Sequence, residues 1–524
     1  MKGAKFIIWL LICSVLLYGT VYANNISDTY VEETTEVSNI QDNIFVGQDS
    51  KEYENRIGDS YYGWSLSLPE DAVITDRSFN GLNTTIEGKD GMYKLTLNIL
   101  EKTDEALYAL TFGMNMENPD VLGKGVGYNS YNYGYNWIVS GDDNNRVVKR
   151  WYVGEKWIFY LQLDVNSRKN YRANIRKYLG ILNSFIPEFS QETAINDLST
   201  VNENGYRTFF NEAMGWKIDV LPEWEMLWEV DKPQKVIFKD IYSGHSDNEL
   251  MITMSSKGDI ANLDSWVSND VIMTSREYNA DMVQLIRTEK QAINGMECSV
   301  LIKSINTGEQ LFYEKIYYLL EEHFKYRIRY TLSEDAYYDD EFRSKVEAMV
   351  QSFCILSPDI YEIGYLTDPD EFYVDELYKT IKNEEAGWSL EVPYSWEVSV
   401  DLESHKTFIS EQSGVIHVGM GVAENVYLEQ FENYYENLAI PLAQLGGNFK
   451  NEKIETLKQK GTIVKKYTNS IKKYNDIYRE EQYVFYKDGY LYTFSVLINQ
   501  LRITPKNIEL IDRIWKSVAI IRDG

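Results

Sequence analysis

The sequence predicts an α+β protein of three tandem domains, each a mainly antiparallel sheet covered by helices. A length of 524 residues allows about three domains of ordinary size, and a hydrophobic fraction of 44% can fill their cores. One pattern occurs three times, at 63–69, 215–222 and 387–393: Gly-Trp, then alternating polar and apolar residues, then Pro. It is typical of a half-buried strand, because proline cannot donate to a sheet ladder and therefore ends it.

The residues after each opening strand also agree between the three copies. The tryptophans Trp64, Trp216 and Trp388 lie 152 and 172 residues apart, which is a domain-sized period. Two short strands and then a helical stretch follow each of them, and the helix is clearest at 263–276. The strands are expected at 85–86 and 93–99, at 236–238 and 250–254, and at 407–409 and 415–420.

Each copy then predicts a long hairpin, an amphipathic helix and a short closing strand. Thr504 is a suitable N-cap for the last helix, and Pro505 suits its first position. Strands joined by hairpins, with helices inserted between them, predict an antiparallel sheet covered by helices. The hairpins are expected at 147–165, 312–331 and 482–498, and the closing strands at 184–185, 352–353 and 517–518. The apolar stripes of the helices are Ile175, Leu179 and Leu182; Phe342, Val346 and Val350; and Ile508, Ile511 and Trp515.

The order of these elements resembles the PsbP-like family of domains. The resemblance rests on the Gly-Trp-x-(Leu/Ile)-x-(Leu/Val)-Pro opening, on Trp224 and Trp396 after it, and on the long hairpin, helix and Ser-Phe ending. Copy one departs from the pattern with Ala72 in place of that tryptophan, and copy two inserts Leu221 before its proline. The resemblance implies an αβα sandwich for each copy and a role in binding or assembly instead of catalysis. It assigns no functional residue.

The chain is therefore divided into three domains with polar segments around them. Acidic side chains and few apolar ones at 24–57 predict a disordered acidic linker. The expected PsbP-like domains are 58–190, 206–357 and 381–524, and the linkers between them are 191–205 and 358–380.

The N-terminus predicts export. Lys2 and Lys5 precede the apolar run 6–17, and Val21 and Ala23 occupy the small-residue positions of a signal-peptidase site. We expect a signal peptide at 1–23 and a secreted protein, extracellular or associated with the cell surface. An uncleaved anchor is the alternative, and it is the only membrane attachment we expect.

Charge argues against two classes of partner. The formal net charge is −28, and without the first 23 residues it becomes −30. Such a field repels phosphate backbones and anionic lipid headgroups, so we expect no nucleic acid and no membrane surface as a partner. Cys298 and Cys354 remain after cleavage, and either a disulfide or two buried free thiols fits their apolar surroundings.

No sequence pattern indicates an enzyme, a metal site or a cofactor. The chain has four histidines and lacks His-Glu-x-x-His, Gly-x-Ser-x-Gly and paired Cys-x-x-Cys motifs. The glycine-rich stretch 123–127 lacks the Gly-Lys-Ser/Thr ending of a phosphate loop, and we interpret it as a flexible loop. Two carboxylates across a cleft cannot be recognised by spacing, so an acid-pair hydrolase stays as an alternative.

The best candidate binding surface is the aromatic run 127–137. If it is extended, Tyr131, Tyr133, Tyr135 and Trp137 line one face. Such rings can stack on sugars or bind a protein, although they can also pack against a helix as core. We therefore expect a non-catalytic binding protein that recognises a cell-surface glycan or protein through the first domain. A structural spacer or assembly subunit of an extracellular complex is the alternative.

Overall fold

The computed structural model describes most of the chain beyond residue 54. The described ranges are 55–115, 120–142, 144–190, 195–228, 232–241, 247–368, 377–401, 406–411, 416–424, 426–434, 449–459, 461–473 and 476–521. The expected signal peptide (1–23) and most of the expected acidic linker (24–57) lie outside them. The chain forms two compact units, one of residues up to 228 with 237–247 and 348–356, the other of 229–236, 248–347 and 357–524.

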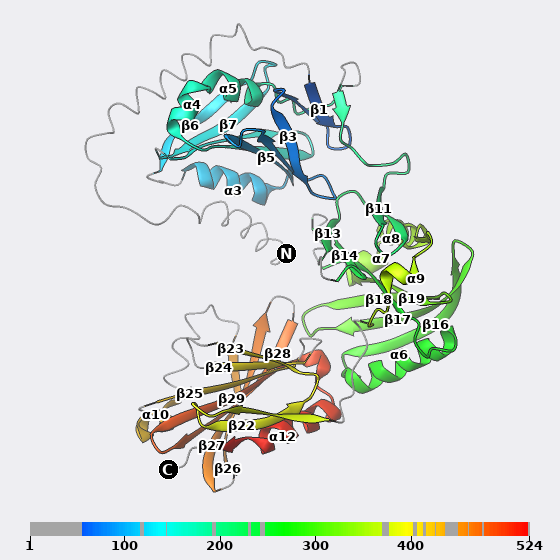
Figure 1. Cartoon of the computed structure of the whole chain (residues 1–524), viewed down its shortest axis with the longest axis vertical. Coiled ribbons are helices and arrows are strands. Elements are labelled where there is room, and N and C mark those ends of the chain that lie inside the picture. The colour runs from blue at the N-terminus through cyan, green and yellow to red at the C-terminus, as the bar shows by residue number, and fades with distance from the viewer. Residues whose placement is uncertain are drawn as a thin grey trace. The chain divides into compact units, whose positions relative to one another are not determined.

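Three seven-stranded antiparallel sheets share one strand order, which confirms that the chain contains repeated α+β domains (Figure 1). We call them repeats 1, 2 and 3. In repeat 1 the order is β3-β4-β5-β9-β8-β7-β6. The other orders are β13-β14-β15-β19-β18-β17-β16 and β23-β24-β25-β29-β28-β27-β26, which are the same topology again.

The strands of repeat 1 are β3 (Ala72–Arg77), β4 (Asn83–Gly88), β5 (Tyr93–Glu101), β6 (Val121–Tyr128), β7 (Gly134–Gly141), β8 (Arg146–Val153) and β9 (Trp157–Val165). Those of repeat 2 are β13 (Glu225–Trp228), β14 (Lys235–Lys239), β15 (Glu249–Ser256), β16 (Val283–Ile293), β17 (Met296–Asn306), β18 (Leu311–Leu320) and β19 (Phe324–Ser333). Those of repeat 3 are β23 (Glu397–Asp401), β24 (Lys406–Ser410), β25 (Ile416–Ala423), β26 (Phe449–Gln459), β27 (Thr462–Lys473), β28 (Asp476–Lys487) and β29 (Tyr490–Asn499). The three long hairpins predicted from the sequence are β8–β9, β18–β19 and β28–β29, so that prediction is confirmed.

The opening Gly-Trp strand of each repeat belongs to a separate small sheet, which the sequence did not predict. A strand just before it folds back on it across a short loop, and Gly63, Gly215 and Gly387 end these loops with φ of 71°, 64° and 74°. This left-handed conformation explains the glycine before each tryptophan, because other residues adopt it only with strain. The small sheets are β10 (Ile195–Asp197), β1 (Asn55–Asp59) and β2 (Trp64–Leu68); β11 (Arg207–Asn211), β12 (Trp216–Val220) and β20 (Cys354–Ile355); and β21 (Tyr378–Asn383), β22 (Trp388–Pro393) and β30 (Ala519–Ile520).

In each repeat one helix follows the third strand of the large sheet along the chain, and a second helix comes after the last strand. The first helices are α3 (Asp104–Asn115), α6 (Leu263–Glu277) and α10 (Leu428–Glu432), and the later ones are α5 (Ile175–Asn183), α8 (Asp340–Gln351) and α12 (Pro505–Ser517). Shorter elements are α4 (Arg168–Ala173), α7 (Glu334–Tyr338), α9 (Ile360–Ile363) and η2 (Gln500–Arg502). Thr504 caps α12 by accepting a hydrogen bond from the Asn507 amide at 3.2 Å, with Pro505 at the first position, as predicted. None of the helices in the described ranges has the length and apolarity needed to cross a membrane.

The core of each repeat contains its opening tryptophan. Trp64, Trp216 and Trp388 are fully buried, which confirms that they serve the fold. Trp64 stacks on Phe185 and Trp216 packs against Phe353. The closing strands were predicted too early in the sequence: β20 and β30 follow the expected residues 352–353 and 517–518, and repeat 1 has an isolated bridge at Ile186 instead of a strand at 184–185.

The sequence alone does not decide whether Cys298 and Cys354 form a disulfide. Cys298 and Cys354 are both free, so they do not form a disulfide. Burial raises the pKa of the Cys298 thiol to about 11, which keeps it protonated and unreactive at neutral pH.

Candidate functional site

The aromatic run of repeat 1 forms a hairpin instead of one extended strand. β6 ends at Tyr128, and β7 begins at Gly134. The Asn129 side chain accepts hydrogen bonds from the amides of Tyr131 and Tyr133 at 3.0 and 2.9 Å, and Asn132 takes the left-handed φ of 67°. These contacts form a turn, so the expected single face of four aromatic side chains does not exist.

The four predicted site residues have different surroundings. Tyr135 is only 3% exposed, and the Arg150 guanidinium lies 4.3 Å from its ring centroid. Tyr133 and Trp137 are partly buried against the core of repeat 1. Burial, assisted by a hydrogen bond to Glu188, raises the pKa of the Tyr133 hydroxyl. Tyr131 is 37% exposed, so it alone of the four presents much of its ring to a ligand.

Arg56 holds Tyr131 at the turn. Its guanidinium carbon lies 5.5 Å from the Tyr131 ring centroid, and a terminal nitrogen lies 3.5 Å from the hydroxyl. The same guanidinium donates to the Ser65 and Ser67 hydroxyls at 2.9 and 3.0 Å. A cation fixed in this way pre-organises the ring, which lowers the entropy lost when a ligand contacts it.

The glycine-rich stretch 123–127 lies in β6, so its interpretation as a flexible loop was wrong. Gly125 pairs with Trp137 and Gly127 with Tyr135 across the hairpin. A Cβ atom at Gly127 would lie 2.9 Å from the Tyr135 ring, and one at Gly125 would lie 3.1 Å from the Trp137 indole. The two rings lie across the backbone of β6, and glycine is the residue that makes room for them.

β6 is an edge strand whose surface differs from the equivalent strands of the other repeats. It carries a single charged residue, Lys124, and its Val126 and Tyr128 are 67% and 62% exposed. The edge strands β16 and β26 contain many charged residues, as natural edges do when they avoid pairing. These are Arg287, Glu289 and Lys290 in β16, and Lys450, Glu452, Lys453, Glu455 and Lys458 in β26. We call residues 121–141 of repeat 1 the edge hairpin.

A charged cluster in repeat 2 was missed by the sequence analysis. Glu314 of β18 pairs with Lys303 at 2.5 Å and with Arg329 at 3.6 Å, and Arg329 also lies 3.8 Å from Glu249. Lys325, Arg327 and Arg329 alternate along β19, so the period of two could have placed these cations on one face. Opposite charges satisfy one another here, which favours a structural role. The described residues hold no cluster of three or more His, Cys, Asp or Glu residues suited to a metal ion.

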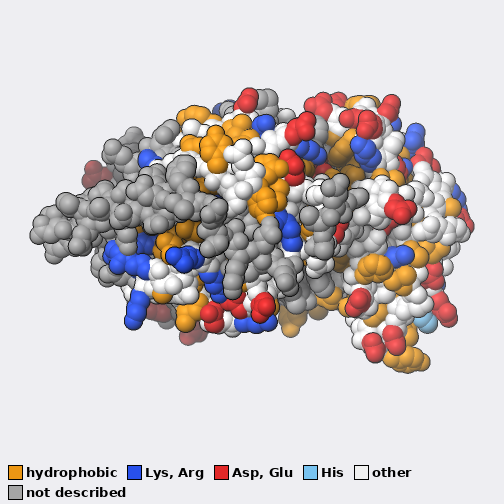
Figure 2. Space-filling view, turned by 90° about the horizontal axis from the view of Figure 1, so that it is seen from above, with side chains coloured by type: hydrophobic (Ala, Val, Ile, Leu, Met, Phe, Trp, Pro, Cys, Tyr) orange, Lys and Arg blue, Asp and Glu red, His pale blue; other side chains and the backbone are white. Residues whose placement is uncertain are grey.

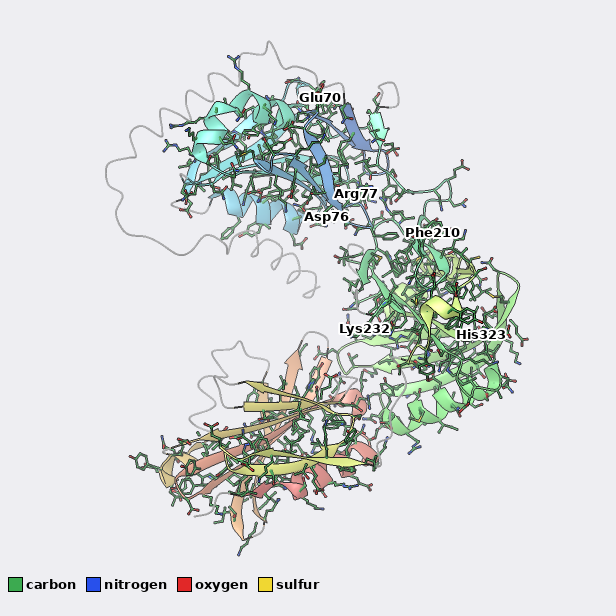
Figure 3. The ribbon with its side chains drawn as sticks, viewed as in Figure 1. Glu70, Asp76, Arg77, Phe210, Lys232 and His323 are labelled. Atoms are coloured by element: carbon green, nitrogen blue, oxygen red, sulfur yellow. The ribbon has the colours of Figure 1, made fainter. Side chains whose placement is uncertain are left out.

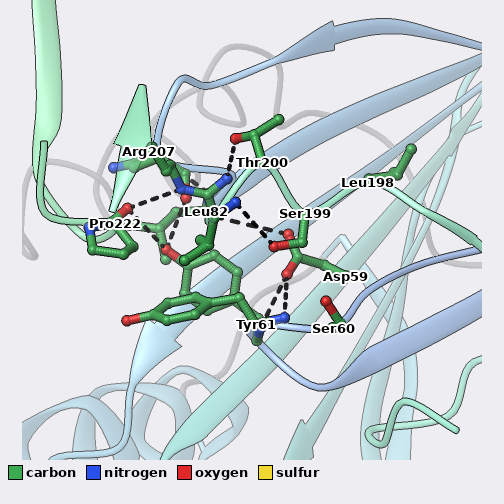
Figure 4. A network of polar contacts seen from close by, with 12 residues as sticks. Asp59, Ser60, Tyr61, Leu82, Leu198, Ser199, Thr200, Arg207 and Pro222 are labelled. Atoms are coloured by element: carbon green, nitrogen blue, oxygen red, sulfur yellow. Dashed lines mark hydrogen bonds and ion pairs between the residues drawn. The ribbon is translucent and has the colours of Figure 1, made fainter. Parts of the chain in front are cut away.

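A buried polar network joins repeat 1 to the first strand of repeat 2 (Figure 4). Asp59 is fully buried; it pairs with Arg77 and lies 3.9 Å from Arg207. Asp59 also accepts hydrogen bonds from the amides of Tyr61 and Tyr62 at 2.9 and 3.0 Å. Figure 3 labels Arg77 at the end of β3 and Phe210 on β11, the strand that begins with Arg207. The network therefore ties β1, β3 and β11 together.

A second buried network joins repeats 2 and 3. Glu277, at the end of α6, pairs with Lys506 and with Arg502 at 3.2 Å. Arg502 also donates from Nε to the backbone carbonyl of Glu277 at 2.9 Å. The side chains of Arg502 and Glu277 are almost completely buried. The amide of Asn279 donates to the Leu501 carbonyl at 2.7 Å. Each junction is thus built on a buried charge that has partners from both repeats.

Charge is unevenly distributed over the surface. Although the formal net charge is −28, the face shown in Figure 2 presents groups of lysine and arginine side chains beside hydrophobic ones. An acidic total therefore does not make every patch acidic.

Comparison with known proteins shows only distant structural similarity. No protein-family model matches the sequence, and no curated protein matches it. The solved structure of CyanoP, a cyanobacterial PsbP from Synechocystis, is 16% identical, with 30% of this chain and 98% of CyanoP covered and a TM-score of 0.24. The Ran-binding protein Mog1p of Saccharomyces cerevisiae is 10% identical, with 30% and 97% covered and a TM-score of 0.23. The immunity protein TplEi of Pseudomonas aeruginosa is 10% identical, with 59% and 99% covered and a TM-score of 0.20.

Proposed function

We propose that the chain is an exported, non-catalytic binding protein that recognises a cell-surface protein or glycan through the edge hairpin of repeat 1. The observation that carries this proposal is the contrast between the three edge strands. β6 exposes Val126 and Tyr128 and has one charged residue, whereas β16 and β26 are rich in charge. Exposed aromatic and aliphatic side chains on a pre-organised turn are typical of a binding surface.

We further propose that each repeat is a PsbP-like αβα sandwich. Support comes from the packing of repeat 1, where Ala106 of α3 belongs to one cluster with Trp151 and Ile158. Ile181 of α5 belongs to another cluster with Tyr152 and Phe159, the next residues along the same two strands. Alternate residues of the same strands point to opposite faces of a sheet, so helices on the two faces would complete the sandwich.

Replacing both exposed tyrosines of the edge hairpin with alanine (Tyr128→Ala with Tyr131→Ala) should weaken ligand binding. Loss of two exposed rings at a binding centre is expected to lower the affinity by about ten-fold or more. The measurement is retention of residues 24–524 on isolated cell-envelope material and on a glycan array. Tyr361→Ala, which removes an exposed ring on α9, is the matched control and should change nothing. Unchanged retention of the double variant would contradict the proposed site.

Export makes a separate prediction. When the full chain is produced in a secreting host, the released protein should begin at Asn24, because Val21 and Ala23 satisfy the signal-peptidase rule. N-terminal sequencing of the released protein checks this. A chain that stays in the cytoplasm would overturn export, and a membrane-bound chain that retains Lys2 would favour the uncleaved anchor.

A structural spacer or assembly subunit is a second candidate, favoured by the buried junction networks. Asp59 and Glu277 each hold cations of the neighbouring repeat in a buried site. Within one compact unit Asp59 fixes repeat 1 to β11, and within the other Glu277 fixes repeat 2 to repeat 3; fixed contacts of this kind are what a spacer requires. Substitutions at these two residues distinguish the candidates, because a protein that binds through repeat 1 alone keeps its ligand when the junction at Glu277 is loosened.

A further inference from the structure

We propose that the edge hairpin binds its partner by strand addition: β6 accepts an extended, uncharged segment of another protein as an eighth strand of the sheet. This inference rests on the proposed function and narrows it to a protein ligand with stated chemistry. Within the described residues, β6 is hydrogen-bonded to β7 alone and lies at the end of the strand order. An edge strand presents unpaired N–H and C=O groups, and these are the groups that an added strand pairs with.

The register of the hairpin identifies which backbone groups are available. The Asn129 amide donates to the Tyr133 carbonyl at 3.0 Å, so this pair is a hydrogen-bonded position of the ladder. Hydrogen-bonded positions alternate along an antiparallel pair. Val126 faces Asn136 and Tyr128 faces Gly134 at the alternate positions, where the paired residues are not hydrogen-bonded to each other. The N–H and C=O groups of Val126 and Tyr128 therefore point away from β7.

The side chains beside this backbone determine the chemistry of the partner. On one face an added strand would lie next to Val126 and Tyr128, whose side chains are mostly exposed. On the other face the partly buried ring of Trp137 lies across Gly125 and brings aromatic surface close to the edge, whereas the ring of Tyr135 across Gly127 is buried. Apolar or β-branched side chains on both faces of the incoming strand would find apolar neighbours. Charged residues in its middle would lose hydration without gaining a partner.

The occupant is a segment of another protein and not a second copy of this chain. Two copies of residues 24–524 would each carry a formal net charge of −30 over the whole chain, and this long-range repulsion opposes self-association. The equivalent edges within the chain are also unsuitable as partners, because β16 and β26 carry charged side chains that hinder strand pairing.

The test uses residues 24–524 and a labelled peptide of about eight alternating valines and threonines, the length of a typical strand, with a lysine at each end for solubility. We expect saturable binding in fluorescence anisotropy and slower hydrogen exchange at the amides of Val126 and Tyr128. A peptide with the same side chains but N-methylated amides should not bind. Val126→Lys should weaken binding by about ten-fold or more, because a charged lysine side chain on an edge strand hinders pairing with another strand, as it does in natural edge strands. Since Val126 is mostly exposed, this variant should keep the melting temperature of the parent.

Ile454→Lys is the matched control, because Ile454 is a half-exposed residue of the equivalent edge strand β26. It should leave peptide binding unchanged. Absence of saturable binding, or equal loss with Ile454→Lys, overturns strand addition at β6. Dimers in sedimentation that Val126→Lys dissociates would assign the edge to a second copy and also overturn the proposal. If glycan or cell-envelope binding still depends on Tyr131 while the peptide fails to bind, strand addition is wrong and the proposed function stands.

Discussion

Asp59→Ala is expected to destabilise the junction of repeats 1 and 2 by about 3–5 kcal/mol, the effect of removing one partner of a buried ion pair. Asp59 is fully buried, pairs with Arg77, lies 3.9 Å from the buried Arg207 and accepts two backbone hydrogen bonds. Without it, two guanidinium groups and two amides lose an acceptor in a site that is largely buried. Urea unfolding of residues 24–524, followed by tryptophan fluorescence, measures the loss.

The control for this variant is Asp71→Ala. Asp71 pairs with Lys177 in the same repeat, but both side chains are partly exposed to solvent. Exposed pairs contribute about 0–1 kcal/mol, so this variant should unfold almost as the parent does. If Asp59→Ala and Asp71→Ala have equal effects, the Asp59 network does not stabilise the junction.

Glu277→Ala should have an effect of similar size, about 3–5 kcal/mol, at the junction of repeats 2 and 3. The substitution removes a carboxylate that pairs with Lys506 and with Arg502, which is almost completely buried. Arg502 keeps its hydrogen bond to the backbone carbonyl of residue 277 and its contact with Glu411 at 3.5 Å. The backbone contact from Asn279 to Leu501 remains, so the repeats should stay adjacent while their coupling weakens. We expect the parent unit to unfold in one transition in calorimetry and the variant to show a broadened or divided one.

The same junction supplies the control for this second prediction. Glu309 pairs with Lys472 at 2.5 Å across repeats 2 and 3, yet both side chains are about 40% exposed. Glu309→Ala should therefore cost no more than about 1 kcal/mol. A large effect of Glu309→Ala together with a small effect of Glu277→Ala would show that burial does not decide the strength of these contacts.

The sequence predicted the repeated part of the fold well. The Gly-Trp pattern, the long hairpins and the Thr504 cap depend on local chemistry that each copy repeats, so their positions are readable from residue types. The small sheets were missed because β1, β11 and β21 are short and half polar, and because their partners are decided by tertiary contacts. In repeat 1, for example, β10 lies in the expected linker 191–205 and pairs in parallel with β1.

The candidate site was harder to predict, because one side chain changes the course of the chain there. Asn129 accepts hydrogen bonds from two amides, which turns a run of alternating aromatic residues into a hairpin. The turn brings Tyr135 and Trp137 over the glycines of β6, and no spacing in the sequence indicates that these residues meet. The contrast in charge between β6 and the other edge strands is visible in the residues, but only after the topology has shown that these strands are equivalent.

The Asp59 network bears on how the protein should be divided for experiments. A fragment that stops before Arg207 would leave Asp59 and Arg77 without their third partner and would expose Phe79, which packs against Phe209 and Phe238. Such a fragment would present a polar and aromatic surface that is mostly covered in the whole chain. Ligand screens on an isolated first repeat would then detect non-specific binding to that newly exposed surface. The protein used for screening should therefore extend through the second repeat.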